Sequence, residues 1–199
     1  MRQRVQALAV ESDSELVRQQ AVLLLALADG TLKLISRNPS FEDGSGEGAQ
    51  GWSYWRKPDV PPEKPLGRML RSRDVAHGGG YSLLCDAMLR GGPVQETALP
   101  GPGRYVAVAW VYAPAGQTSR GTVELTLTPL DEQGRNLPGY SSGTAPPPPG
   151  RWSLVTLIAT VPEAVAGSKV ARLRLVPIVD GFQAGGRVHL DEVGLYRLD

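Results

Sequence analysis

Several short stretches in the second half of the chain carry apolar residues at every second position. Residues 123–128 and 172–175 alternate between apolar and polar side chains, which is typical of β-strands with one buried and one wet face. Residues 105–112 are apolar on both faces, as expected of a central strand in a layered structure. Turn-forming glycines and prolines separate the stretches, and no helices alternate with them. The pattern predicts an all-β fold, an antiparallel β-sandwich.

The first 36 residues differ in kind from the rest of the chain. A helix is expected over residues 13–28, because apolar periodicity there ends at Gly30, a typical helix stop. A short strand is expected over 31–35, so we divide the chain into an N-terminal segment, 1–36, and a sandwich, 37–199. Apolar side chains wrap much of the helix, which therefore requires burial. Either the helix packs on the sandwich or ends a preceding domain, or it docks to other protein subunits.

Charge and hydropathy exclude several classes of partner. The 21 Lys and Arg residues nearly balance the 20 Asp and Glu residues, so no basic field is present to bind nucleic acid. The apolar run 21–28 is far too short for a membrane span, and no membrane insertion is expected. No secretory signal follows Met1, which predicts synthesis without classical secretion. Cys85 is the single cysteine, and we expect a buried, inert thiol.

Four phrases occur in a fixed order along the chain: Asn38 to Gly44 (NPSFEDG), Gly51-Trp52, His77 to Leu83 (HGGGYSL) and His189 to Val193 (HLDEV). In order and spacing they resemble the carbohydrate-binding modules of the 4/9 type, which are galactose-binding-like jelly rolls. The resemblance covers residues 37–199. It implies a jelly-roll sandwich that binds a ligand.

Catalytic motifs are not recognisable in the sequence. It has two histidines, one cysteine, and no HExxH, GxSxG or CxxC spacing. The carboxylates Glu42 and Asp191 could act as a pair in glycoside hydrolysis, but they lie in the two phrases that bind a structural calcium ion in the resembled family. We therefore expect a protein that is not an enzyme.

The resemblance also implies where such a calcium ion would bind. The side chains of Glu42 and Asp191 and the carbonyls near Ser40, His77 and Gly80 would coordinate it. A hard cation prefers several oxygen ligands, and it would relieve the repulsion between two adjacent carboxylates. The alternative is that either carboxylate simply caps a turn.

Sugar binding requires exposed aromatic rings, because pyranoses stack their C–H faces on them. The candidates are Tyr54 and Trp55, ahead of a polar loop at Lys57-Pro58-Asp59, together with Tyr112. We expect the other tryptophans of the sandwich in its core, namely Trp52, Trp110 and Trp152. The alternative is that the candidate aromatics pack under the loop or at a subunit contact.

Two functions remain open from the sequence. The first is a non-catalytic structural or attachment subunit of a bacteriophage virion, in its tail, neck or decoration, with the helix contacting other subunits and the sandwich facing outward. The second is an extracellular glycan-binding module of a secreted polysaccharide-degrading enzyme. The start at Met1 and the apolar helix favour the first, and polysaccharide is a candidate ligand in both.

Overall fold

The structure is a computed structural model that describes residues 2–57 and 67–198 of the 199-residue chain. Two helices, α1 (Arg2–Glu11) and α2 (Glu15–Asp29), precede the strands. The strands of the two large sheets are β1 (Leu32–Leu34), β4 (Ser53–Arg56), β5 (Arg68–Ser72), β6 (Ser82–Asp86), β7 (Arg90–Ala98), β8 (Gly103–Tyr112), β9 (Thr122–Leu130), β10 (Tyr140–Ser141), β11 (Trp152–Val161), β14 (Arg172–Asp180) and β15 (Arg187–Leu198). Two small hairpins are β2 (Gly44–Ser45) with β3 (Gly48–Ala49), and β12 (Ala164–Val165) with β13 (Ser168–Lys169).

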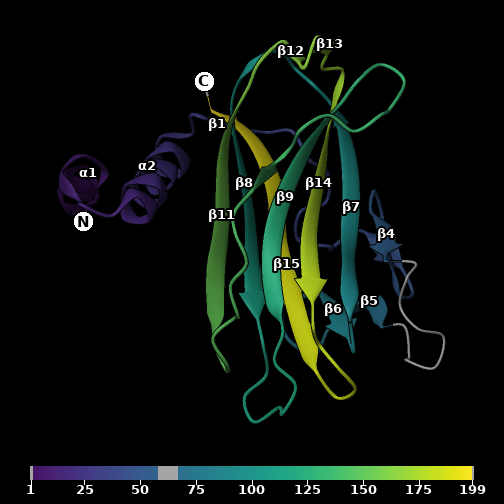
Figure 1. The fold of residues 1–199 in the computed structure, drawn as a ribbon. Coiled ribbons are helices and arrows are strands. Elements are labelled where there is room, and N and C mark those ends of the chain that lie inside the picture. Colours follow the sequence, from purple (N-terminus) through teal and green to yellow (C-terminus); the bar gives the residue numbers. More distant parts are fainter. Residues whose placement is uncertain (1, 58–66, 199) are drawn as a thin grey trace.

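The large strands form two antiparallel sheets that face each other (Figure 1). The six-stranded sheet has the order β11-β8-β15-β6-β5, and β1 adds to β15. The five-stranded sheet has the order β10-β9-β14-β7-β4. Apart from β5 with β6 and β9 with β10, neighbours in the sheets are not consecutive in the chain, which is the jelly-roll type of connection. The predicted antiparallel sandwich with an N-terminal helical extension is confirmed.

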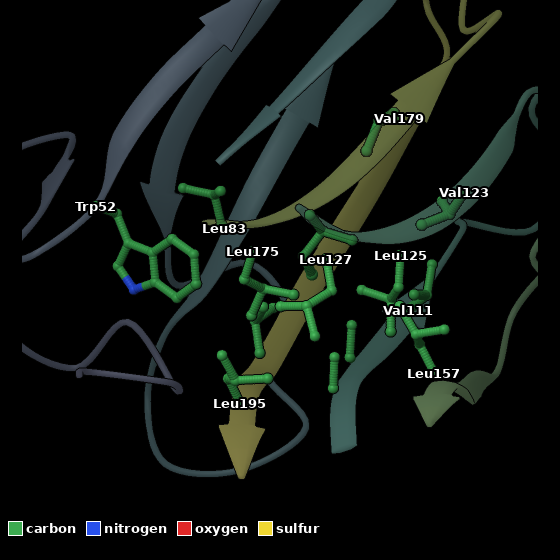
Figure 2. Packing of buried hydrophobic residues seen from close by; sticks show 14 of the residues in the cluster. Trp52, Leu83, Val111, Val123, Leu125, Leu127, Leu157, Leu175, Val179 and Leu195 are labelled. Carbon is green, nitrogen blue, oxygen red and sulfur yellow. The ribbon is translucent and has the colours of Figure 1, made fainter. Parts of the chain in front are cut away.

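The inner faces of the two sheets enclose one apolar core. Alternate residues of β8, β9, β14 and β15 point into it, and Figure 2 shows Leu125, Leu127, Val111 and Leu157 packed together there. Trp52 is also part of this core: its indole tilts against the Phe41 ring, with centroids 5.4 Å apart. The prediction that Trp52 is a core residue is confirmed. Cys85 is fully buried, as predicted, and burial raises the pKa of its thiol to about 12.

Helix α2 lies against the outer face of the six-stranded sheet, on the side of the sandwich away from β4, and α1 packs against α2 farther from the strands (Figure 1). Leu23 of α2 is 1% exposed and packs with Val106 and Val108 of β8. The double-sided apolar pattern of residues 105–112 is thereby explained, since one face of β8 meets the core and the other meets α2. The helix therefore packs on the sandwich, which is the first of the two alternatives.

Helix α2 runs close to the predicted bounds, and β1 forms within the predicted strand. Helix α1 was not predicted, and it has no buried residue among those described. Within the described residues, neither helix is long and apolar enough to cross a lipid bilayer.

Candidate functional site

A loop at residues 77–81 is held by the C-terminal strand β15. The Asp191 carboxylate accepts the backbone N–H groups of His77 at 2.7 Å and Gly78 at 3.1 Å through Oδ2, and that of Glu192 at 2.7 Å through Oδ1. Asp191 is fully buried, so these three donors offset the cost of removing the carboxylate from water. Burial raises the pKa of Asp191, the three N–H groups oppose that rise, and the negative charge of Glu192 adds to it.

The same loop is held from the other side by the N-terminal phrase. Glu42 Oε1 accepts the backbone N–H groups of Gly80 and Tyr81, both at 3.0 Å. A Cβ at Gly79 would lie 2.4 Å from Glu42 Oε1, and its φ is +67°. Only glycine fits this position. Glu42 and Asp191 thus join the first strands, the 77–81 loop and the last strand.

The contacts of these carboxylates bear on whether a calcium ion fits between them. Calcium takes six to eight oxygen ligands, but both Asp191 oxygens accept N–H groups, and the Arg71 guanidinium donates to the carbonyls of Phe41 and Glu42. In the described part of the chain, no three His, Cys, Asp or Glu side chains gather in a metal-binding cluster. The geometry favours the turn-capping alternative. Calcium binding itself is untested by these contacts and stays a prediction.

A groove of about 540 Å³ crosses the outer face of the five-stranded sheet. We call it the groove. Polar and apolar side chains from β4, β7, β9, β14 and the turn after β9 line it. The lining residues are Ser53, Tyr54, Trp55, Val94, Glu96, Thr126, Thr128, Asn136, Arg174, Val176 and Ile178. Volumes of this order are typical of ligand sites, as is an apolar lining with a few convergent polar groups.

Polar side chains on the floor of the groove are fixed by one another. Arg174 Nε and Nη2 donate to Glu96 Oε1 at 2.9 and 2.7 Å, and Nη1 donates to Asn136 Oδ1 at 2.9 Å. Arg172 Nη1 donates to Glu96 Oε2 at 3.3 Å from beside the groove. The charges of Glu96 and Arg174 cancel within the lining, and their rotamers are held before any ligand binds.

Of the predicted sugar-binding residues, Trp55 lies at the rim of the groove and Tyr54 points mainly inward. Trp55 is 36% exposed. Its register partner on the neighbouring strand β7 is Gly92, which has no side chain to cover the indole. The Tyr54 ring packs against the core, and its hydroxyl accepts the N–H of Ala49 at 3.3 Å. Burial raises the pKa of Tyr54. Of the polar loop expected after Trp55, Pro58 and Asp59 lie outside the described residues.

Tyr112 is separate from the groove, because it belongs to β8 in the six-stranded sheet. There it faces Trp152 of β11 directly, with ring centroids 5.4 Å apart. Trp110 and His77 complete this group, with their rings stacked 3.9 Å apart. Trp110 and Trp152 are half-buried on the outer face, so their expected place in the core is wrong. Trp152 shares the outward face with Tyr112 because register-paired residues of adjacent strands lie on one face. Trp110 shares it because residues two apart in a strand point to the same side.

Sequence reasoning identified only Tyr54 and Trp55 of the groove lining; the residues it missed include Glu96, Asn136, Thr126, Thr128 and Arg174. A signal for part of them was present, since the alternation in 123–128 and 172–175 predicts a wet face that carries Thr126, Thr128 and Arg174. Glu96 could not be placed, because the strand that carries it, β7, begins with Arg90-Gly91-Gly92-Pro93, which reads as a turn.

No protein-family model matches the sequence, and no curated protein matches it. Solved structures do match the fold. The CBM22-1 xylan-binding domain of Paenibacillus barcinonensis Xyn10C is similar with a TM-score of 0.56 and 16% identity, over 80% of this chain and 92% of that one. TmCBM61 in complex with β-1,4-galactotriose is similar with a TM-score of 0.55 and 19% identity, over 83% and 99%.

An enzymatically active domain of a phage protein, tailspike protein 4 of bacteriophage CBA120, is also similar, with a TM-score of 0.57 and 17% identity. The match covers 81% of this chain and 21% of the tailspike chain, so the protein spans about a fifth of that relative. These likenesses show that the chain has the jelly-roll sandwich fold shared by several carbohydrate-binding modules.

Proposed function

We propose that the protein is a non-catalytic carbohydrate-binding module of the 4/9 type that holds a neutral polysaccharide chain in the groove. The observation that supports it best is the pairing of a half-exposed Trp55 with a pre-organised polar floor of Glu96, Asn136 and Arg174. An indole offers a face for the C–H side of a pyranose, and the floor offers donors and acceptors for its hydroxyl groups.

Charge supports a neutral ligand. Because Arg174 and Glu96 cancel within the lining, an anionic glycan would gain little attraction there. Hydrogen bonds to fixed charged groups are roughly twice as strong as those between neutral groups, so a ligand hydroxyl that joins this network is bound without new side-chain ordering. Xylan and β-1,4-galactan are reasonable first ligands, since similar folds bind xylan and β-1,4-galactotriose.

The acidic side chain in the groove lining supports a binding role without catalysis. Hydrolysis of a glycosidic bond uses two carboxyl groups on either side of it. Glu96 is the one acid among the described lining residues, and it is tied to Arg172 and Arg174. Held in this way, its carboxylate is suited to fixing the floor.

Isothermal titration with xylohexaose and with β-1,4-galactotriose tests the proposal. We expect Trp55→Ala to weaken binding by about tenfold, roughly 1.4 kcal/mol, because the pyranose loses the aromatic face on which its C–H groups stack, and Trp55→Phe to weaken it less. Thermal melting of both variants should match the parent, since β4 is an edge strand and Trp55 is exposed. Unchanged affinity in Trp55→Ala would remove the groove as the site.

We further propose, as the biological setting, that the module is a subunit of a phage virion. Apolar side chains on the N-terminal helices support it: Leu8, Val10 and Leu24 are 47%, 81% and 51% exposed, and the fold is like that of a tailspike domain. Light scattering should show self-association that Val10→Asp with Leu24→Asp removes. A parent that is monomeric at every concentration would favour the alternative, an extracellular module of a polysaccharide-degrading enzyme.

A further inference from the structure

The outer face of the six-stranded sheet carries a second group of aromatic side chains, which we call the aromatic platform: His77, Trp110, Tyr112 and Trp152. Tyr112 and Trp152 are register partners on β8 and β11, and Trp152 also meets the His77 ring edge-on at 5.5 Å. His77 stacks on Trp110 with 16° between the planes. Each ring touches another member, so the platform is rigid before any ligand arrives.

The platform begins where helix α2 stops covering the sheet. On the same face, Val106, Val108, Leu154 and Ile158 pack against Leu23 and its surroundings. Trp110 pairs with Leu154 in register and lies at the border, followed by Tyr112 and Trp152. Along β8 and β11 the face is mainly apolar, but the register partners of Tyr112 and Trp110 on β15 are the buried His189 and Asp191. Trp110, Tyr112 and Trp152 keep part of their surface exposed beyond α2.

Polar groups border the platform. His77 Nδ1 lies 2.6 Å from Glu192 Oε2, so one carboxylate faces the imidazole. A hollow of about 230 Å³ beside Trp110 is lined in part by Ser40, Glu192 and Tyr196, two hydroxyl groups and that carboxylate. Aromatic faces next to a few donors and acceptors are the combination that recognises a pyranose.

Size favours a sugar over a protein partner. A fully buried aromatic side chain covers roughly 150–250 Å², and Trp110, Tyr112 and Trp152 are already half-buried. Their remaining exposed area is on the order of 200 Å², whereas a stable protein interface buries roughly 800 Å² on each partner. The patch is large enough for one or two pyranose rings.

We infer that the aromatic platform is a second carbohydrate-binding site, on the sheet opposite the groove, which takes the same class of neutral glycan. This inference rests on the proposed function. Two sites on opposite faces bind two separate chains or two segments of one long chain, and such linkage raises retention on a polysaccharide far above the affinity of either site alone.

The stoichiometry of oligosaccharide binding tests the second site. Titration of the full chain with xylohexaose and with β-1,4-galactotriose is expected to give two sites per protein. Trp55→Ala and Tyr112→Ala are each expected to reduce the count to one, and the double variant to zero. Trp152→Phe keeps an aromatic ring that packs beside Tyr112, so the fold is retained and the second site is expected to bind more weakly than in the parent.

Tryptophan fluorescence adds an independent readout. A sugar that stacks on the platform should shift the emission of Trp110 and Trp152, and this shift should persist in Trp55→Ala and shrink in Trp152→Phe. If one site is found and Trp55→Ala alone removes it, the second site is overturned while the groove stands. If only the platform variants lose binding, the groove proposal fails and the platform stands. A dimer that Trp152→Phe or Tyr112→Ala dissolves would also overturn the inference, since a second copy would then be the occupant.

Discussion

Arg174 donates two hydrogen bonds to a single carboxylate oxygen of Glu96, from Nε at 2.9 Å and from Nη2 at 2.7 Å. The two residues lie directly opposite each other on β14 and β7. Glu96 and Arg174 neutralise each other within the groove lining, and the two hydrogen bonds fix the guanidinium against the Glu96 carboxylate. Ligand selectivity in the groove should therefore depend on Glu96 as much as on Trp55.

Glu96→Gln keeps the shape of the side chain and removes its charge, which leaves the Arg174 charge uncompensated. We expect xylohexaose affinity to fall by about tenfold, roughly 1.4 kcal/mol, because Arg174 loses its charge-assisted partner. Polygalacturonate should bind in low salt and dissociate as ionic strength rises. Affinity electrophoresis in both polysaccharides measures this. An unaltered preference for neutral glycan would show that the pair does not set selectivity.

Gly92 is required where β7 passes between β4 and β14. A Cβ at this position would lie 1.9 Å from the backbone carbonyl oxygen of Pro177, so Gly92→Ala must displace β14. We expect a loss of at least about 2 kcal/mol in the free energy of unfolding, measured by urea denaturation. Gly48→Ala is the matched control, since its Cβ would meet only Ser45 O, at 3.5 Å. Equal stability of the two variants would contradict the close approach.

The same glycine shows what the sequence could and could not predict. Alternation in 123–128 and 172–175 identified β9 and β14, because each has one face in the core. Strand β7 was not predicted, since Gly91, Gly92 and Pro93 resemble a turn locally, and only the neighbouring strands explain why side chains are excluded there. The neighbouring strands require small residues at this point of β7, and the spacing of apolar residues along the sequence carries no information about such a requirement.

The candidate site shows a similar division. Trp55 was identified because an exposed aromatic residue near a loop is a local feature. Trp110 was predicted to lie in the core with the other tryptophans of the sandwich, yet its side chain lies on the face of β8 that meets α2 and the platform. The apolar pattern of this strand predicts that both of its faces avoid water, and it does not distinguish contact with the core from contact with a helix.

Leu23 and Leu24 are adjacent in α2 and differ in environment, with 1% and 51% of their surfaces exposed. Leu23→Ala should lower the free energy of unfolding by about 2–5 kcal/mol, as expected for a buried leucine, and should release α2 to proteolysis. Leu24→Ala should leave stability within about 0.5 kcal/mol of the parent. Limited proteolysis followed by mass spectrometry measures release of the helix. A stable, protected Leu23→Ala variant would show that α2 is held in another way.

The buried His189 should make the free energy of unfolding of the sandwich decrease in mild acid. It is 2% exposed, its Nδ1 lies 3.0 Å from Ser82 Oγ, and burial lowers its pKa below the usual 6.5. Nearby Asp74 raises this pKa and Arg187 lowers it further. As pH falls below about 6.5, the unfolded chain binds a proton that the folded chain excludes, so the free energy of unfolding decreases.

The comparison that isolates this effect is His189→Asn, which keeps a donor near Ser82 and does not titrate. Urea denaturation between about pH 7.5 and about pH 5.5 should show a steeper loss of stability for the parent than for the variant. Parallel pH profiles would mean that His189 is protonated in the folded state as readily as in the unfolded one.

Glu42 and Asp191 offer the decisive test of the calcium prediction. Five backbone N–H groups already donate to their carboxylates, and a cation would have to compete with those donors. If the carboxylates only cap the loop, chelation by EDTA leaves the melting temperature unchanged, whereas Glu42→Gln lowers stability by about 1–3 kcal/mol through weakened hydrogen bonds. Asp43→Asn is the control, because Asp43 lies next in the chain and its hydrogen bonds with described residues are made by its backbone, to Asn38 and Gln50. A melting temperature that falls with EDTA and recovers with calcium would instead establish the metal, and would mean that the loop turns its carbonyls toward the ion when calcium binds.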